Sequence, residues 1–510
     1  MRNRLRSVLA ALAATMIAVA AVGSAAAQST TAYTTKFVTS ITYQNVGNGP
    51  AGIRLQFYSQ GGGSPVTISQ PNLNQNASVS LAVGGITDPA LPSGFKGGAV
   101  LSSDQPVVAT MVQVPTNSNV RNRPLSNGFS PDAGAAEFLI PTVLKNAFNT
   151  TTQFSVQNVD TDAADITVRF LNADASAGAI GAVVHTVNID ALPAGSVSYV
   201  DAGTIAELGA SFNGSATITA VKDNTTTAGK VVATALELET TNIGASAFEG
   251  VIGGTNGGSN KLYMPSAMCN AFQGNSSAYA VQNVAPLGGA NAVVTVTYRA
   301  RPASNPAAEL ETFIDTATIV PGTKNSFGGC AKLPAGYSGS AVIESTGAKI
   351  VGIAKIVGAG VTTSAPGATS GASRLALPYV RFTTSFYTTP DAQGFRRQIT
   401  TLAIQNVGGV TVPANSITVT YLDKNGATVG NPHVIATDLL DGRKVNSSPS
   451  NAGSAAAEFG AYGDGTFGGG AIVNCTAPGC QLVVVARVQS SNGTLVAGED
   501  YNGIPIAATP

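Results

Sequence analysis

The chain has 510 residues, enough for three or four domains of ordinary size, each with its own core. Only 11% of the residues are charged and 44% are apolar, with 58 glycines, a composition typical of secreted all-β chains with many turns. Lys plus Arg equals Asp plus Glu at 27 each, which excludes the net field that nucleic acids or anionic membranes require of their partners.

The first 27 residues are predicted to be an export signal that is cleaved before Gln28. Arg2, Arg4 and Arg6 form its basic end, residues 8–22 its apolar run, and residues 25–27 its small-residue cleavage site. A membrane anchor is the alternative, but the apolar run is short and rich in alanine. We therefore expect a mature chain without a membrane span, secreted or held at the cell surface by other molecules.

A Gln-Asn pair recurs four times at domain-sized intervals. The pairs are Gln44-Asn45, Gln157-Asn158, Gln282-Asn283 and Gln405-Asn406. Such a period indicates four copies of one unit. We predict an all-β chain of four tandem antiparallel β-sandwich (immunoglobulin-like) domains: residues 28–135, 136–257, 258–372 and 373–510.

Each unit carries the same features in the same order after its Gln-Asn pair. An alternating apolar strand with an aromatic third residue comes first, which indicates one buried face. These strands contain Ile53, Leu55 and Phe57; Ile166, Val168 and Phe170; Val294, Val296 and Tyr298; and Ile417, Val419 and Tyr421. Later comes an aromatic residue, a glycine and a small residue, and the small residues are Gly98, Ser215, Ser340 and Gly470. Glycine there is expected to allow a bulge or a close approach under the ring.

The unit boundaries also differ in a regular way. Units two to four open with an apolar residue and proline, at Ile140-Pro141, Met264-Pro265 and Leu377-Pro378, and the first unit lacks this feature, which fits a capping repeat. Residues 117–136, 253–260 and 358–373 are rich in Gly, Ser, Thr, Asn or Pro and are predicted to be linkers of limited stiffness. The expected arrangement is beads on a string, and the sequence does not fix their relative orientation.

The Gln-Asn pairs are interpreted as structural. Asn tolerates a left-handed conformation and can bond its own backbone two residues on, while Gln can hold an adjacent loop carbonyl. The functional alternative is a row of identical polar contacts for a repeating ligand such as a glycan.

Four cysteines, Cys269, Cys330, Cys475 and Cys480, are predicted to form disulfides in an exported chain. Three pairings are possible, and the repeat boundaries favour Cys269 with Cys330 and Cys475 with Cys480. A metal site is the alternative, but histidine is lacking near both pairs.

Residues for catalysis are scarce, and no catalytic residue, metal or cofactor is predicted. The two histidines, His185 and His433, lie in alternating segments where solvated positions are expected, and no Gly-x-Ser-x-Gly elbow is present. The acidic residues Glu309, Glu311 and Asp315 are interpreted as a solvated charge run rather than an acid/base pair. Two segments resemble parts of a calcium loop, residues 160–162 and 423–426, and both lack the rest of such a loop.

The fourth unit contains aromatic residues interleaved with arginines. Tyr379, Arg381, Tyr387, Arg396 and Arg397 form a candidate ligand patch, since rings stack on sugars and Arg binds carboxylates or phosphates. The alternative is a sandwich core with an exposed loop.

A strand that ends in Gln-Asn-Val-Gly at residues 44–47, followed by an alternating strand and a Gly-rich hairpin, resembles bacterial extracellular immunoglobulin-like repeats, including the cell-adhesion-related (CARDB-like) type. Only units one and four keep the glycine directly after the valine. The resemblance implies a secreted or cell-surface structural or adhesive protein without catalytic residues. Its expected partners are other surface or matrix components, further copies of the chain, or glycans. The alternative function is a carbohydrate-binding accessory protein.

Overall fold

The computed structural model describes residues 35–116, 120–239, 244–255, 257–358, 361–383, 394–453, 468–494 and 496–507. The predicted export signal and its cleavage site lie outside these residues. Throughout the described ranges the chain is all-β, and its helices are short 3-10 turns. No helix in those ranges has the length and apolar character needed to span a bilayer.

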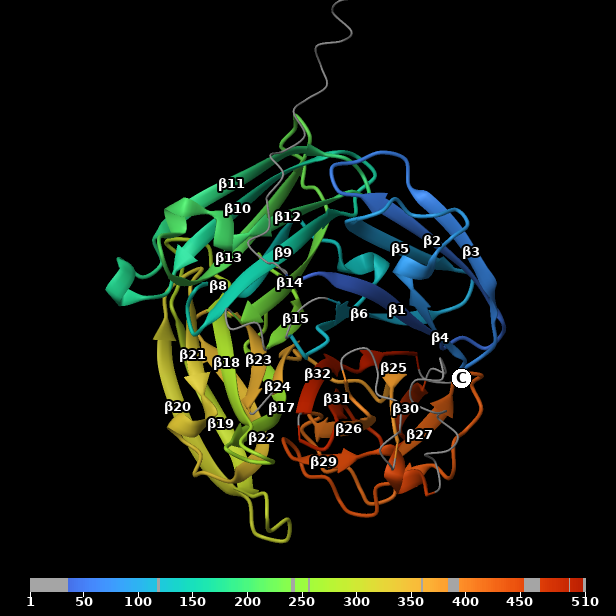
Figure 1. Ribbon diagram of the computed structural model, residues 1–510. Coiled ribbons are helices and arrows are strands. Elements are labelled where there is room, and N and C mark those ends of the chain that lie inside the picture. Colours follow the sequence, from blue (N-terminus) through green and yellow to red (C-terminus); the bar gives the residue numbers. More distant parts are fainter. Residues whose placement is uncertain are drawn as a thin grey trace, which may run out of the picture.

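The strands form four units, each with two facing antiparallel sheets (Figure 1). We call the sheet that contains the Gln-Asn strand the axial sheet and its partner the outer sheet. The axial sheets have the strand orders β4-β1-β6-β7, β12-β9-β14-β15, β21-β18-β23-β24 and β29-β26-β31-β32. The outer sheets have the orders β3-β2-β5, β11-β10-β13-β8-β16, β20-β19-β22-β17 and β28-β27-β30-β25-β33.

From the Gln-Asn strand onward, the first two units have the same order of strands, and unit two has in addition β8 before that strand and β16 at its end. Unit one contains β1 (Phe37–Asn45), β2 (Ala51–Ser59), β3 (Val66–Leu73), β4 (Ser78–Ala82), η1 (Val83–Gly85), β5 (Gly97–Ser103), β6 (Val107–Pro115) and β7 (Leu125–Asn127). Unit two contains η2 (Pro131–Ala133), β8 (Glu137–Lys145), β9 (Thr150–Asn158), β10 (Ala164–Asn172), η3 (Ala175–Ala177), β11 (Val183–Leu192), β12 (Val197–Asp201), η4 (Ala202–Thr204), η5 (Ala206–Leu208), β13 (Phe212–Lys222), β14 (Val231–Glu239), β15 (Ala245–Glu249) and β16 (Val251–Ile252).

Units three and four repeat the path of unit two. Unit three contains β17 (Lys261–Cys269), β18 (Ser276–Asn283), β19 (Ala292–Pro302), β20 (Glu311–Ile319), β21 (Lys324–Gly328), η6 (Gly329–Ala331), β22 (Tyr337–Thr346), β23 (Ile350–Gly358) and β24 (Val361–Pro366). Unit four contains β25 (Arg374–Val380), β26 (Arg397–Asn406), β27 (Ile417–Asp423), β28 (His433–Val434), β29 (Lys444–Ser447), η7 (Pro449–Ala452), β30 (Gly469–Cys475), β31 (Leu482–Ser491), β32 (Val496–Asn502) and β33 (Ile504–Pro505).

The alternating strands supply the core between the two sheets of each unit. In β2, Ile53, Leu55 and Phe57 are buried while the residues between them are more exposed, as period-two alternation requires. The corresponding residues of β10, β19 and β27 are also buried in the cores of their units. The sequence pattern therefore located the core strand of every unit.

Both disulfides pair as the repeat boundaries favour. Cys269 at the end of β17 is joined to Cys330 in η6, and Cys475 at the end of β30 is joined to Cys480. Each bridge lies within one unit. The bridges therefore hold local turns, and the first two units fold without any disulfide.

The four units close into a ring (Figure 1). The last strand of each axial sheet lies at the ring axis, where β7 contacts β15, β15 contacts β24, β24 contacts β32, and β32 contacts β7. Each interface joins one face of a unit to a different face of the next unit, and four such head-to-tail contacts close the ring. The fourth unit thus contacts the first.

The expected beads-on-a-string arrangement is therefore wrong, because each unit packs against two others. Residues 120–136, predicted to be linker, include β7 and the buried Val120 and Asn122 at the ring axis. Residues 361–366, in another predicted linker, form β24. Small and polar residues are used here for close packing at the axis, where the composition had indicated flexibility.

Candidate functional site

The asparagine of each Gln-Asn pair bonds three backbone groups within its own unit. Its Nδ2 donates to two carbonyls at 2.6–2.9 Å: Asn45 to Gly49 and Leu73, Asn158 to Asp162 and Leu192, Asn283 to Ala290 and Ile319, and Asn406 to Val410 and Leu439. Its Oδ1 accepts the N–H two residues on, from Gly47, Asp160, Ala285 and Gly408. The side chain thereby joins two loops at the end of the sandwich.

The glutamine of each pair holds the carbonyl of a turn in the same unit. Its Nε2 donates to Asn76, Gly195, Gly322 or Gly442, at 2.9–3.2 Å. These four acceptors, and not the motif asparagines, adopt the left-handed backbone conformation, with φ of 64°, 75°, 74° and 72°. The left-handed conformation expected at the motif asparagine is thus found in the turn that the glutamine holds, at Asn76 in unit one and at a glycine in the other three units.

The same turns form the interfaces between units. At two interfaces a serine of the preceding unit donates to the carbonyl that the glutamine also contacts: Ser215 Oγ to Gly322 O and Ser340 Oγ to Gly442 O, both at 2.8 Å. At the other two the position is glycine, because a Cβ on Gly98 or Gly470 would lie 2.8 Å from the Nε2 of Gln157 or Gln44. The two sequence signatures therefore meet across every interface of the ring.

Sequence reasoning did not find this contact. The glycine of this signature was interpreted within one unit, as a bulge or a close approach under the ring, and a Cβ on Gly97 or Gly214 would indeed meet the ring of Phe95 or Phe212. The small residue that follows it was given no role. The signal that could have shown the contact is that only Gly or Ser occupies this position in all four units. Both residues leave room for a neighbouring carboxamide, and only Ser adds a donor.

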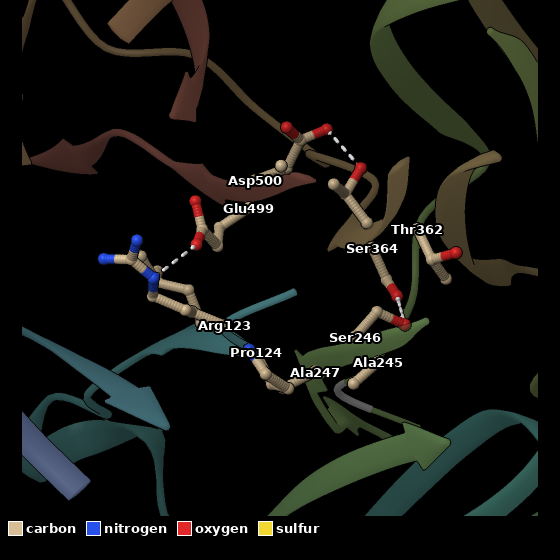
Figure 2. A pocket seen from close by; sticks show the side chains of 12 residues that line it. Arg123, Pro124, Ala245, Ser246, Ala247, Thr362, Ser364, Glu499 and Asp500 are labelled. Atoms are coloured by element: carbon tan, nitrogen blue, oxygen red, sulfur yellow. Dashed lines mark hydrogen bonds and ion pairs between the residues drawn. The ribbon is translucent and has the colours of Figure 1, made fainter. Parts of the chain in front are cut away.

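The gap between the side chains at the ring axis has no space in which a water molecule fits. All four units line it (Figure 2). The residues are Arg123 to Leu125, Ala245 to Ala247, Thr362 to Ser364 and Gly498 to Asp500. The axis is thus a packed junction and not a binding pocket for a small molecule.

Polar contacts join neighbouring units around this junction. Arg123 Nε lies 3.6 Å from the Glu499 carboxylate, joining units one and four. Ser364 donates to Ser246 at 2.6 Å, joining units three and two, as Figure 2 shows. Thr363 of unit three donates to Asp500 of unit four at 2.8 Å. In addition, the Asn127 amide of unit one donates to Glu249 of unit two.

Buried charge also lies between units two and three. Lys355 binds Glu237 at 2.7 Å, and the nearby Lys324 is 5% exposed. Burial, with the positive charge of Lys355, lowers the pKa of Lys324 to about 7, and Glu237 opposes this shift only in part. Lys324 is therefore partly neutral at physiological pH in the folded protein.

This shift predicts a pH dependence of stability. Between pH 7 and pH 9 the unfolded chain keeps the Lys324 proton and the folded chain loses it, so the free energy of unfolding rises with pH by about 2 kcal/mol from this group. We expect urea unfolding at the two pH values to show the rise and Lys324→Met to reduce it. The part that remains comes from Lys444, because burial and the charge of Arg487 lower the pKa of that lysine to about 8. An equal rise in Lys324→Met would assign the effect to other groups.

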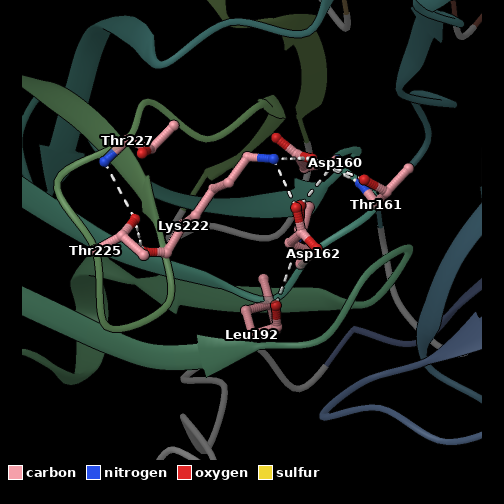
Figure 3. A network of polar contacts seen from close by, with 8 residues as sticks. Asp160, Thr161, Asp162, Leu192, Lys222, Thr225 and Thr227 are labelled. Atoms are coloured by element: carbon pink, nitrogen blue, oxygen red, sulfur yellow. Dashed lines mark hydrogen bonds and ion pairs between the residues drawn. The ribbon is translucent and has the colours of Figure 1, made fainter.

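The calcium candidates are occupied by other contacts. At residues 160–162 the Lys222 ammonium lies 2.6 Å from Asp162 and 3.5 Å from Asp160, between the two carboxylates (Figure 3). Burial alone would raise the pKa of Asp160, but the Thr161 amide and Lys222 lower it. Asp423 accepts the amides of Asn425 and Ala427 and so forms a turn. The described residues hold no group of three or more side chains placed to bind a metal ion.

The acidic run in β20 is divided among separate partners. Glu311 accepts from Tyr337 Oη at 2.6 Å, and Asp315 lies 3.6 Å from Lys332. None of the described contacts joins the carboxylate of Glu311 or Asp315 to Glu309.

The histidines differ in their surroundings. His185 lies half-buried, 3.8 Å from Glu207. His433 is half-buried rather than solvated, and its Nδ1 shares a 2.8 Å hydrogen bond with Ser447, whose hydroxyl also bonds Tyr421. Burial lowers the pKa of His433. Ser447 is 1% exposed, so this Ser–His pair is closed to a substrate.

The candidate ligand patch is divided between core and surface. Tyr379 is 3% exposed and packs in the core of unit four, so its ring face is not available for a sugar. The Arg381 guanidinium lies 5.0 Å from the centre of that ring. Arg396 and Arg397 are half-buried beside the start of β26, and Tyr387 lies outside the described residues. The predicted stacking surface thus loses Tyr379, which serves the core.

Fold and site together define an all-β protein of four repeated sandwiches closed into a ring. No protein-family model matches the chain, and no curated protein matches it.

Proposed function

We propose that the protein is a secreted or cell-surface structural protein with an adhesive role and no catalytic activity. One observation carries the proposal: the polar residues that recur in all four units bond backbone groups and neighbouring units, so the repetition serves shape. The ring gives a stable platform whose outer loops are available for contact with other molecules.

The compartment follows from different evidence. The two disulfides suit an oxidising environment, and the N-terminal sequence is that of an export signal. The resemblance to extracellular immunoglobulin-like repeats agrees with this proposal. Surface or matrix components, further copies of the chain and glycans are the proposed partners.

Fractionation of the native cells tests the proposal. We expect the protein in the medium or on the cell surface, beginning at Gln28 and with all four cysteines oxidised, as intact mass and thiol labelling would show. Recovery from the cytoplasm with free thiols would contradict it.

Carbohydrate binding is the competing outcome. A glycan array probed with the full mature chain would support it only if Arg396→Ala and Arg397→Ala abolish retention. Tyr379 is no longer a suitable test residue, since its replacement would disturb the core.

A further inference from the structure

We infer that the free edge of β5 in unit one accepts an extended strand from a partner protein, one that carries an apolar residue followed by proline. In units two to four the outer sheet includes a first strand, β8, β17 or β25, beside the strand that corresponds to β5. In unit one the described outer sheet ends at β5, which pairs with β2 alone. The inference names a partner class for the proposed structural role.

The backbone shows what this edge is built to bind. In the complete units the amides of Ala220, Ser345 and Cys475 donate, each at 2.8 Å, to the residue just before or at the start of the first strand: Ala136, Asn260 and Ser373. By sheet register the matching residue of unit one is Ser103, opposite Ile53. Alternation along the strand directs the amides of Leu101 and Ala99 to the same side. These donors form a strand-addition edge.

The core of unit one is incompletely covered at this place. Residues of β13, β22 and β30 that face the core are buried, whereas Ala99 and Leu101 of β5 are only partly buried. Phe95 and Leu91 beside them are partly buried as well. A strand with apolar side chains at this edge would remove these surfaces from water.

The neighbouring unit shows the same gap independently. β8 packs on β18 and β23 of the next unit, and β25 packs on β1 and β6. The valine after the Gln-Asn pair takes part in this contact: Val284 packs with Leu139 of β8, and Val46 packs against the cluster that contains Ala376 of β25. Val284 is 8% exposed, whereas Val159 of unit two, at the same place in its unit, is 37% exposed. One missing strand therefore leaves both β5 and Val159 uncovered.

The segment of this chain at the corresponding sequence position does not resemble the three first strands. The segment that precedes β1 as β8 precedes β9 is residues 24–32, which contain only Ser, Ala, Gln and Thr. The predicted cleavage before Gln28 would remove part of it. The three strands with the apolar-proline pair are each paired within their own units, so a second copy has none to donate without opening. The fitting occupant is a partner strand that resembles β8, β17 and β25.

A peptide tests the inference on the mature chain, residues 28–510. The probe is the sequence of β8, Glu137 to Lys145, with blocked ends and a fluorescent label, and a scrambled peptide is the control. We expect saturable one-to-one binding of the β8 peptide alone, measured by anisotropy. Ala99→Pro, which removes an outward donor from an edge strand, should weaken it about tenfold or more, and Ala99→Ser should retain it.

A second pair of variants leaves β5 intact. Val159→Asp places a charge in the gap and should weaken binding, whereas Val293→Asp, at a valine 50% exposed in β19, should not. No saturable binding, or binding unchanged in both Ala99→Pro and Val159→Asp, would overturn the inference. Oligomers of the chain alone that Ala99→Pro dissociates would make a second copy the occupant and also overturn it. Cell fractionation tests the proposed function separately, so either can fail alone.

Discussion

Replacing Asn283 by alanine will lower the free energy of unfolding by about 4 kcal/mol. The side chain is fully buried, and it bonds the carbonyls of Ala290 and Ile319 and the amide of Ala285. The variant leaves the buried Ile319 carbonyl and two partly buried backbone groups, those of Ala290 and Ala285, without their partner, at about 1–3 kcal/mol for each group that water does not reach. Urea unfolding followed by tyrosine fluorescence measures this loss, since the chain has no tryptophan.

The control for this variant is Asn291→Ala, at an exposed asparagine of the same unit. We expect it to change stability by less than about 0.5 kcal/mol. Gln282→Ala should have a smaller effect than Asn283→Ala, because the Gln282 carboxamide makes a bond to Gly322 while its Oε1 is buried without a partner among the described atoms. Equal stability of Asn283→Ala and Asn291→Ala would remove the structural interpretation of the repeated pair.

Replacing Asp500 by alanine will also lower the free energy of unfolding by about 4 kcal/mol, through the ring axis. Asp500 is 5% exposed, accepts two bonds from Arg487 at 2.8 and 2.6 Å, and accepts another from Thr363 of unit three. Loss of one partner leaves a buried guanidinium without its counter-charge, which typically costs about 3–5 kcal/mol. The unfolding midpoint in urea should fall accordingly.

A surface pair provides the matched control. Lys261 and Glu344 lie 2.8 Å apart, but both side chains are about half exposed, so Glu344→Ala should cost no more than about 1 kcal/mol. Adding Arg487→Met to Asp500→Ala should recover part of the loss, because the unpaired charge is then absent. No difference between the Asp500 and Glu344 variants would show that the pairing of Asp500 with Arg487 does not stabilise unit four at the ring axis.

The sandwich units could be predicted because their signals are local. The alternation of Ile53, Leu55 and Phe57 depends only on the pleat of one strand, and the bond from Asn283 to Ala285 spans two residues. The pairing of Cys269 with Cys330 follows from the repeat boundaries.

The ring could not be predicted from the sequence. Its contacts join residues such as glycine and serine, and each of these can be explained by the turn or strand in which it lies. A glycine such as Gly470 suggests a bulge within its own strand, and only the structure shows that Gln44 of another unit lies against it. Tyr379 and Arg381 suggest a surface patch, and only the packed structure shows the tyrosine in the core. The carboxylates of Asp160 and Asp162 suggest a cation site, and the cation present is Lys222, distant in sequence.

Sequence and structure both indicate that unit one differs from the other units at its first strand. The sequence lacks an apolar-proline pair there, which fits a capping repeat, but a closed ring has no terminal repeat to cap. Among the described residues no strand occupies this position between units one and two, and the proposed partner strand follows from that.

Closure of the ring also bears on resistance to proteolysis. Since unit four touches unit one, every unit is held by two neighbours, and one cut by a protease in any connecting loop would leave all four units in place. Release of a fragment would require two cuts and the separation of two interfaces. Nicked molecules should therefore keep their shape.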